Sequence, residues 1–554
     1  MSRDTHYQSE LRRAGFEPHG GQWSITVAEL ANIAEDTVGR HARAARGHHP
    51  ALIYEASDGA VQSLSFAELN DKANRLASTL RNQGVDRGQP VGVHLNQRPQ
   101  TAIAHLALYK LGAIVCTMSG LYGQDTLTHI LRDTGLRLVF TCARHGPLAD
   151  ACAHLRAEGL DAPRVIDCDT EFESMIADGD PAFVPVQTRA DEPALLMYTS
   201  GSTGLPKGML HAHRVLFAYL PTVRMFYDLS MDSDSSVFWT PADWAWVGGL
   251  LDLVLPAWAH GQTVLAWSGR FDAVESLRLC ARHGVTHSFM TPTALKRLAE
   301  VDDPHQIPGL RLKNICTGGE SLPGVVIDWT GRVLGAACNE FYGLTEVNHL
   351  IGNCRALYPV RPGSMGKVYP GHTVRLVDDE GNDVKTGEIG EIVVSADDPT
   401  LFLGYWGRLG VADEMRIGTW LRTRDLARMD DDGYVWYQGR NDDLIKSAGY
   451  RIGPAEVEDA LLSHPAVAEA AVIGSPDAQR GSIVKAFVRL CAGVAASDAL
   501  VQELQQMVKK DLAAYKYPRE IEFVDAFPLT SSGKIRRAEL RRQEVLRKQA
   551  TVIA

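Results

Sequence analysis

The sequence has few of the features that mark nucleic-acid-binding or membrane proteins. Acidic residues outnumber basic ones by 67 to 56, giving a formal net charge of −11, and both kinds are spread along the chain. No block of lysines and arginines therefore predicts a nucleic-acid surface. The longest apolar stretch, Trp244 to Ala259, contains Asp252 and Pro256 and is shorter than the roughly 20 residues of a membrane-spanning helix. We expect this stretch to be buried core, and we expect small-molecule partners.

Metal-binding and secretion signals are also missing from the sequence. Its nine cysteines form no C-x-x-C pair and show no histidine spacing suited to zinc. Buried free thiols are the expectation. The N-terminus begins Met1-Ser2-Arg3-Asp4 and continues into polar sequence, without the charged-then-apolar pattern of a signal peptide. We therefore expect a cytoplasmic protein.

Helical and strand patterns alternate from about residue 50. Ser65 and Glu68 predict a capping box, the apolar stripe of the following helix runs from Leu69 to Leu80, and Gly84 can end it. Short, nearly continuous apolar runs predict strands at 91–95, 113–118, 137–142, 263–267, 286–291 and 314–317. This rhythm predicts an α/β fold of mostly parallel sheets covered by helices.

The pattern changes towards the C-terminus. Between about 365 and 438, short alternating strands with Asp-Gly turns predict an antiparallel subdomain. A shorter α+β segment follows Gly439-Arg440. Its predicted elements are a helix at 455–462, strands at 468–473 and 484–490, and a helix at 499–514. We predict a large N-terminal domain at 1–438, a connection at 439–442 and a small α+β C-terminal domain at 443–554.

A loop at 198–208 is suited to phosphate binding, because it gathers hydroxyl residues and glycines before Lys207. Backbone N–H groups and hydroxyls can surround phosphate oxygens, and a lysine adds positive charge. The loop is not a Walker A motif, since Gly208 and Met209 follow the lysine where a Ser or Thr would be required. Alone, it could equally be a flexible loop.

Five further motifs accompany this loop. They are Thr-Gly-Gly-Glu-Ser at 317–321, Tyr-Gly-Leu-Thr-Glu at 342–346, Thr-Arg-Asp at 423–425, Gly-Arg-Asn-Asp-Asp at 439–443 and Pro-Leu-Thr-Ser-Ser-Gly-Lys at 528–534. In this order and at these separations they resemble the adenylate-forming superfamily of acyl-CoA synthetases, adenylation domains and luciferases, over roughly residues 30 to 540. The resemblance implies an AMP-forming acyl-CoA synthetase that uses ATP, Mg²⁺ and coenzyme A, with a mobile C-terminal domain.

The resemblance also implies a nucleotide site. The loop would hold the β- and γ-phosphates, Tyr342 would lie against the adenine, Thr345 would bind the α-phosphate and Glu346 would take the magnesium ion. An aromatic face, a hydroxyl donor and a hard oxygen ligand suit these tasks. Asp425 would accept hydrogen bonds from the ribose hydroxyls, with Arg440 assisting. The remaining residues of the implied site are Thr199, Ser200, Gly201, Ser202, Thr203, Gly204, Lys207, Gly319, Glu320, Ser321 and Gly343.

The resemblance implies that different residues of the C-terminal segment act in the two half-reactions. Lys534 would bridge the acid's carboxylate and the phosphate during adenylation, which makes it a catalytic residue together with Thr345 and Glu346. Asp442 matches the hinge about which the small domain swings. Residues 447–451 would then face the site, with Gly449 and Tyr450 beside the pantetheine channel and Arg451 near the AMP phosphate. Arg480 is a weaker candidate for the phosphates of coenzyme A.

The segments at 239–246 and 447–454 resemble most the acetyl-CoA and medium-chain acyl-CoA synthetase branch, and this resemblance implies an acyl pocket at Trp246, Val247, Gly248, Gly318 and Gly343. Three glycines predict a cavity deeper than acetate needs, and therefore a medium-length, branched or aromatic carboxylic acid. Because one methylene usually changes selectivity only about 10- to 200-fold, several acids are expected to react. Asn348 and His349 indicate either an oxygenated substrate or simply a capping Asn and a core His.

Three other functions compete with this one. A stand-alone adenylation enzyme could load an amino or hydroxy acid onto a carrier protein, with Asp243 pairing an amino group. A phosphotransferase would release ADP and need a general base beside an acceptor hydroxyl, and no kinase motif set is present. A non-catalytic binding protein is disfavoured because Lys534 and Glu346 are both retained.

Overall fold

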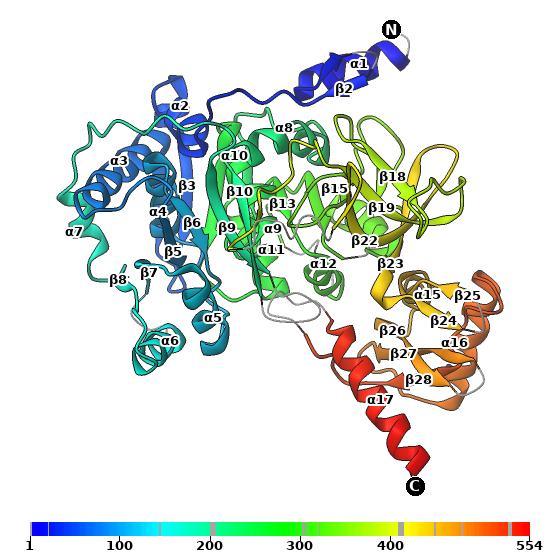
Figure 1. Ribbon diagram of the computed structural model, residues 1–554. Coiled ribbons are helices and arrows are strands. Elements are labelled where there is room, and N and C mark those ends of the chain that lie inside the picture. The colour runs from blue at the N-terminus through cyan, green and yellow to red at the C-terminus, as the bar shows by residue number, and fades with distance from the viewer. Residues whose placement is uncertain are drawn as a thin grey trace.

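The computed structural model describes residues 3–19, 22–142, 146–199, 206–301, 304, 307–320, 322–407, 415–447, 450–477, 480–529 and 535–553. Figure 1 shows a large body, with the strands β18, β19 and β22 at one side and a smaller C-terminal unit in orange and red beside β23. The N-terminal helix α1 (Arg3–Ala14) lies on the outside of the large body.

Within the described residues, a first sheet has the strand order β20-β10-β9-β6-β5-β7-β8. Its parallel strands are β5 (Pro90–His94), β6 (Ile114–Thr117), β7 (Leu138–Thr141), β8 (Arg164–Asp167) and β9 (Pro193–Thr199). The strands β10 (Lys207–Ala212) and β20 (Gly404–Tyr405) join antiparallel at one edge. Its accompanying helices are α3 (Phe66–Asn82), α4 (Pro99–Leu111), α5 (Gln124–Thr134), α6 (Gly146–Ala157) and α7 (Phe172–Ala177).

A second sheet runs in the order β18-β19-β22-β23-β17-β16-β15-β14-β13-β11-β12-β3-β4, with β21 (Arg416–Ile417) on β22. Its parallel part is β3 (Pro50–Glu55), β11 (Val237–Trp239), β12 (Thr263–Trp267), β13 (His287–Phe289), β14 (Asn314–Gly318) and β15 (Ala337–Tyr342). The antiparallel strands are β4 (Val61–Ser65), β16 (Ile351–Gly352), β17 (Gly366–Val368), β18 (Val374–Val377), β19 (Ile389–Ser395), β22 (Trp420–Met429) and β23 (Tyr434–Arg440). Both the predicted parallel sheets and the predicted antiparallel strands are therefore present.

The helix α3 begins as its sequence predicts. The Ser65 hydroxyl accepts a hydrogen bond from the Glu68 N–H at 3.2 Å, and the Glu68 carboxylate accepts one from the Ser65 N–H at 2.8 Å. These reciprocal bonds satisfy two N–H groups that the first turn would otherwise leave without partners. The stripe from Leu69 to Leu80 faces the core.

The apolar stretch at 244–259 forms α9 (Val247–Gly249), the π-helical turn η3 (Leu250–Val254) and α10 (Leu255–Ala259). Its large side chains are buried in the main core, as expected. In the described part of the chain, no helix is both long and apolar enough to cross a membrane. The other helices of the large body include η1 (Glu35–Gly39), α2 (Arg40–Ala42), α8 (Arg214–Phe226), α11 (Ala273–Arg282), α12 (Pro292–Ala299) and α13 (Gly324–Trp329).

The C-terminal unit has its own hydrophobic core, which includes Val472, Val484 and Leu504. Its elements are η6 (Asn441–Asp443), β24 (Ile445–Ser447), β25 (Tyr450–Ile452), α15 (Pro454–Leu462), β26 (Val467–Asp477), β27 (Gly481–Leu490), α16 (Asp498–Asp511), β28 (Glu520–Phe523) and α17 (Arg537–Ile553). The buried Glu544 of the terminal helix α17 accepts hydrogen bonds from Lys485 and Ser475, both at 2.7 Å, and these bonds hold α17 against β26 and β27.

Candidate active site

Parts of two predicted motifs, the ends of the 198–208 loop and the 342–346 segment, meet where the two sheets adjoin. Thr199 ends β9 and pairs with Lys207 at the start of β10, so the ends of the 198–208 loop are held side by side. Thr345 and Glu346 follow β15, at the carboxyl end of a parallel strand of the second sheet. Ligands of open α/β sheets commonly bind at such strand ends.

The segment around Tyr405 joins these two motifs. The Phe402 N–H donates to the Glu346 carbonyl at 2.9 Å, and the Trp406 N–H donates to the Gly208 carbonyl at 2.8 Å. The Tyr405 hydroxyl donates to Glu346 Oε1 at 2.7 Å. The Lys207 ammonium lies 5.3 Å from the centre of the Tyr405 ring. The residues predicted for phosphate and magnesium are thus neighbours through Tyr405, which the sequence analysis missed because no spacing rule or charge pattern singles it out.

A second group of side chains surrounds Asp425 on β22. The Tyr342 hydroxyl donates to Asp425 Oδ2 at 2.8 Å, and the Tyr437 hydroxyl donates to Asp425 Oδ1 at 3.2 Å. Arg440 forms an ion pair with the same carboxylate at 3.8 Å. Burial, and then the Asp425 charge, raise the pKa of Tyr342 well above its ordinary value. Its phenol therefore stays protonated and donates, which orients the carboxylate.

The predicted acyl-pocket glycines are closely packed. A Cβ on Gly248 would lie 2.5 Å from the Phe289 ring, and one on Gly318 would overlap the Phe341 ring. A Cβ on Gly343 would lie 2.7 Å from the backbone nitrogen of His349. Aromatic rings and backbone atoms therefore occupy the space where a side chain would lie at each of these glycines. The three glycines do not by themselves imply a deeper cavity. The depth and the placement of the acyl pocket stay predictions.

Asn348 and His349 belong to the core. The Asn348 amide donates to Asp252 Oδ1 at 2.7 Å, and His349 Nε2 lies 3.1 Å from the same oxygen. The His349 ring stacks on Phe341 at 4.3 Å with an interplanar angle of 3°. Burial raises the pKa of Asp252, although the bonds from His349 and Asn348 act against this. Of the two interpretations offered by the sequence, the geometry favours the structural one.

Asp243 also has a local structural task. Its Oδ2 accepts a hydrogen bond from the Ser119 hydroxyl at 2.6 Å, and its Oδ1 accepts one from the Ala245 N–H at 3.0 Å. These bonds shape the turn that leads to Trp246, whose ring packs edge-to-face on Tyr122 with centroids 5.5 Å apart. A carboxylate engaged in this way is poorly placed to pair with an incoming amino group.

Some predicted residues fall outside the described residues or are described in part. Ser200, Gly201, Ser202, Thr203, Gly204, Ser321, Gly449 and Lys534 lie outside them, and only the backbone of Arg451 is described, paired with Lys446 in β24 and β25. Gly319 and Glu320 follow β14, and Glu320 accepts a hydrogen bond from Thr293 at 3.1 Å. Tyr450 is exposed and stacks on Tyr515 with ring centroids 4.2 Å apart.

The predicted hinge residue Asp442 lies in η6, between the two units. Arg541 of α17 donates to the Asp442 carbonyl at 2.6 Å and forms an ion pair with Asp443 at 2.7 Å. Leu529 and Ile535, the described residues on either side of the segment that contains Lys534, form an antiparallel bridge. The terminal helix therefore connects the hinge to the Lys534 segment.

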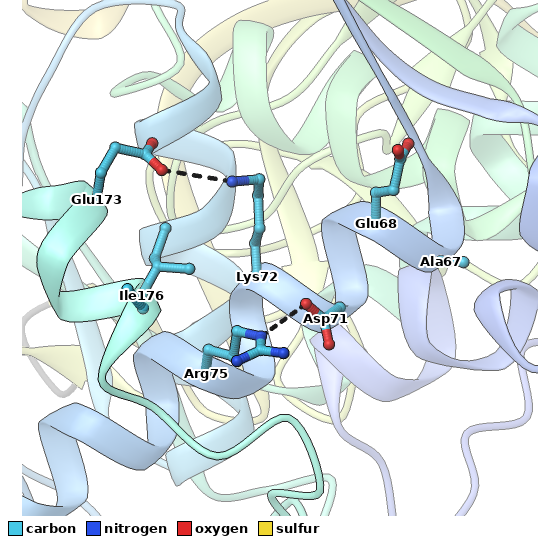
Figure 2. Close-up of a pocket in the computed structure, with 8 residues that line it drawn as sticks. Ala67, Glu68, Asp71, Lys72, Arg75, Glu173 and Ile176 are labelled. Carbon is cyan, nitrogen blue, oxygen red and sulfur yellow. Dashed lines mark hydrogen bonds and ion pairs between the residues drawn. The ribbon is translucent and has the colours of Figure 1, made fainter.

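A separate surface cleft of about 500 Å³ lies between α3 and α7 (Figure 2). Its charged residues pair with one another: Lys72 with Glu173 at 3.5 Å, and Arg75 with Asp71 at 2.9 Å. It contains none of the predicted site residues.

Comparison with known proteins agrees with this geometry. The model of the AMP-binding enzyme family matches residues 39–406, and that of the AMP-binding enzyme C-terminal domain matches residues 456–534. The chain belongs to the AMP-binding enzyme family. The predicted adenylate-forming superfamily and its α/β fold are thereby confirmed, as is the class of AMP-forming acyl-CoA synthetase with ATP, Mg²⁺ and coenzyme A as its reactants and cofactors.

Relatives of this AMP-binding enzyme cover most of its length. It is 36% identical to the uncharacterized acyl-CoA ligase YtcI of Bacillus subtilis, over 90% of this chain and 94% of the relative. It is 35% identical to 4-hydroxybutyrate-CoA ligase 1 of Metallosphaera sedula, over 90% and 88%. The crystal structure of the anthranilate CoA ligase AuaEII with anthranoyl-AMP superposes with a TM-score of 0.84 at 28% identity, covering 94% of this chain and 99% of that one.

Proposed function

We propose that this acyl-CoA synthetase activates a medium-length, branched or aromatic carboxylic acid. The observation that carries the site assignment is that Lys207 and Glu346 share Tyr405 as a neighbour, while Asp425 accepts a hydrogen bond from Tyr342 of the same motif as Glu346. A cation for phosphate, a carboxylate for a divalent metal ion and a second carboxylate for ribose are the groups that binding of magnesium and ATP requires.

The nucleotide half of the site follows from these contacts. Asp425, oriented by Tyr342 and Tyr437, would accept hydrogen bonds from the ribose hydroxyls. The face of the Tyr342 ring would lie against the adenine, and Arg440 would add positive charge beside Asp425. The loop from Thr199 to Lys207, with Gly319, Glu320 and Ser321, would enclose the phosphates.

The metal fits the carboxylate of Glu346. A hard divalent cation prefers oxygen ligands, and one oxygen of Glu346 is already oriented by the Tyr405 hydroxyl. When bound, magnesium would neutralise phosphate charge during adenylation. Thr345 would bind the α-phosphate, and Lys534 would bridge that phosphate and the acid's carboxylate.

The second half-reaction would use the other face of the C-terminal unit. We propose domains at 1–438 and 443–554 with a hinge at 439–442, where Asp442 changes its torsions. Gly449 and Tyr450 would then line the pantetheine channel, Arg451 would contact the AMP phosphate, and Arg480 would meet the phosphates of coenzyme A. We place the enzyme in the cytoplasm, where ATP and coenzyme A are available.

The proposed acid would lie against Trp246, Val247, Gly248, Gly318 and Gly343. The aromatic rings of Phe289 and Phe341, which lie against Gly248 and Gly318, would line one side of this pocket and would suit an apolar acyl group. Relatives whose names specify anthranilate and 4-hydroxybutyrate are consistent with acids beyond acetate. Loading of a carrier protein with an amino acid finds no support at Asp243, whose two oxygens are engaged by Ser119 and Ala245.

Oxygen-18 transfer tests both the acid and the mechanism. The enzyme is incubated with ATP, Mg²⁺ and coenzyme A and with carboxyl-¹⁸O-labelled acetate, butyrate, octanoate, isobutyrate or benzoate in separate reactions. Attack of the carboxylate on the α-phosphorus leaves one label in AMP, whereas an ADP-forming route would label inorganic phosphate. We expect labelled AMP and a thioester, with larger acids outperforming acetate. Unlabelled AMP would contradict the mechanism, and a preference for acetate would contradict the proposed acid class.

A further inference from the structure

Tyr405 occupies a position between the two halves of the phosphate site. Its strand β20 pairs antiparallel with β10, so that Tyr405 faces Met209, two residues after Lys207. Its hydroxyl reaches across to Glu346 on the other sheet at 2.7 Å. The side chain is 6% exposed and is packed edge-to-face on Phe402 with centroids 5.1 Å apart. Its position is therefore fixed by backbone pairing and by packing before any ligand arrives.

The hydroxyl proton of Tyr405 has a defined destination. Among the described residues, the hydroxyl oxygen also lies 3.4 Å from the sulfur of Met415, a longer contact to a weak acceptor. The phenol O–H therefore donates its hydrogen bond to the carboxylate, at 2.7 Å, because a carboxylate is the stronger acceptor.

The ring and the hydroxyl of Tyr405 have separate neighbours. The hydroxyl contacts Glu346 Oε1, while the ring lies beneath the exposed Lys207, whose ammonium is 5.3 Å from the ring centre. Backbone bonds on both sides of Tyr405, from Phe402 to Glu346 and from Trp406 to Gly208, keep this arrangement in register. A change at the hydroxyl can therefore be separated experimentally from a change at the ring.

We propose that Tyr405 is a positioning residue that orients the Glu346 carboxylate for a divalent cation and holds Lys207 beside it through its ring. This inference rests on the proposed metal role of Glu346. The hydrogen bond fixes Oε1 and with it the plane of the carboxylate, so that a metal bound to nucleotide phosphates meets a preformed ligand. Preorganisation of a metal ligand by an outer hydrogen bond typically changes metal affinity about 10- to 100-fold.

Tyr405→Phe is the first variant because it removes the hydroxyl and keeps the ring over which Lys207 lies. We expect the free divalent cation needed for half-maximal AMP formation to rise about ten-fold, with kcat at saturating cation within about two-fold of wild type. Binding of Mn²⁺ to the enzyme with ATP, followed by the electron paramagnetic resonance signal of free Mn²⁺ without acid or coenzyme A, should weaken by a similar factor. Tyr405→Leu, which also removes the ring, should raise the KM for ATP in addition.

Tyr358→Phe is the matched control, because the Tyr358 hydroxyl donates to the Gly352 carbonyl at 2.8 Å, outside the proposed site. It should leave the cation requirement unchanged. In a Glu346→Gln background, Tyr405→Phe should add no further loss of Mn²⁺ binding, because its effect acts through that carboxylate. Circular dichroism and the thermal midpoint confirm that each variant is folded.

Two outcomes would overturn the inference. Equal cation requirements for wild type and Tyr405→Phe would show that the hydroxyl does not orient the metal ligand. A full additional loss in the Glu346→Gln background would show that Tyr405 acts elsewhere. Failure of the proposed function would be distinguishable from failure of this inference. If the wild type formed no AMP in response to acid, binding of Mn²⁺ and ATP could still be measured and compared for the wild type and every variant.

Discussion

Asp425→Asn is the substitution that reports most directly on the nucleotide site. The amide keeps the shape of the side chain, and the phenols of Tyr342 and Tyr437, now 2.8 and 3.2 Å from the carboxylate, can stay in place. What disappears is the negative charge. Hydrogen bonds to charged groups contribute about 1.5–3 kcal/mol and neutral ones about 0.5–1.5 kcal/mol, so each ribose bond should lose about 1 kcal/mol.

Two ribose hydroxyls therefore give a loss of about 2 kcal/mol, which corresponds to roughly 30-fold in the KM for ATP. The assay compares ATP with 2′-deoxy-ATP and 3′-deoxy-ATP. Wild type should lose about ten-fold in kcat/KM for each missing hydroxyl, and Asp425→Asn should lose three-fold or less, because its bonds are already weaker.

The control for this comparison is Asp430→Asn. Asp430 directly follows the last residue of β22 and pairs with Arg361, so we expect an unchanged KM for ATP. Equal sensitivity of wild type and Asp425→Asn to the missing hydroxyls would refute the reasoning, since the carboxylate would then not contact the ribose. A fall in the thermal midpoint of several degrees would instead report a loss of folding stability.

Three further predictions follow from the structure. Gly453→Ala would place a Cβ 3.0 Å from the carbonyl carbon of Gln438 and closer to its oxygen, and we expect only one of the two half-reactions, adenylation or thioester formation, to slow about ten-fold. The control Gly123→Ala, at a helix N-cap with open space, should change neither half-reaction. Equal slowing of both half-reactions would contradict a cycle in which the C-terminal unit takes a different orientation for each. Burial, and then the charge of Asp459, raise the pKa of Glu340 from 4.5 to about 8. The folded chain therefore holds a proton that the unfolded chain has lost, and the free energy of unfolding should fall as pH rises through this window. Glu340→Gln should make the urea midpoint less dependent on pH between pH 5 and 9, and an unchanged pH dependence would contradict this. Excess EDTA should abolish AMP formation, and added Mg²⁺ should restore it fully; activity that survives chelation would contradict a metal requirement.

Local sequence rules predicted those parts of the fold that depend on neighbours in the chain. The capping box of Ser65 and Glu68 formed as predicted, because its partners are three residues apart. The parallel strands and the antiparallel segment were also recognised, since their patterns reflect burial on two faces or on one. The roles predicted for Lys207 and Glu346 followed from the family resemblance, and the structure shows that both residues contact Tyr405.

Contacts between distant segments could not be predicted in this way. Tyr405 meets Glu346 across 59 positions of sequence, and no periodicity relates them. Glycine at 318 could mean open space or close packing, and only the position of the Phe341 ring shows that it is close packing. The sequence left His349 with two interpretations, a pocket residue or a core residue, and its contact with Asp252 in η3 favours the core.

The most direct test of the central claim is AMP release from ATP, measured with and without acid and coenzyme A, in wild type and Lys534→Ala. The preferred acid from the labelling experiment is used at saturating concentration. We predict AMP in step with thioester when both acid and coenzyme A are present, and a loss on the order of 10²- to 10³-fold in the variant. ADP in place of AMP, or full activity in Lys534→Ala, would contradict the proposed mechanism.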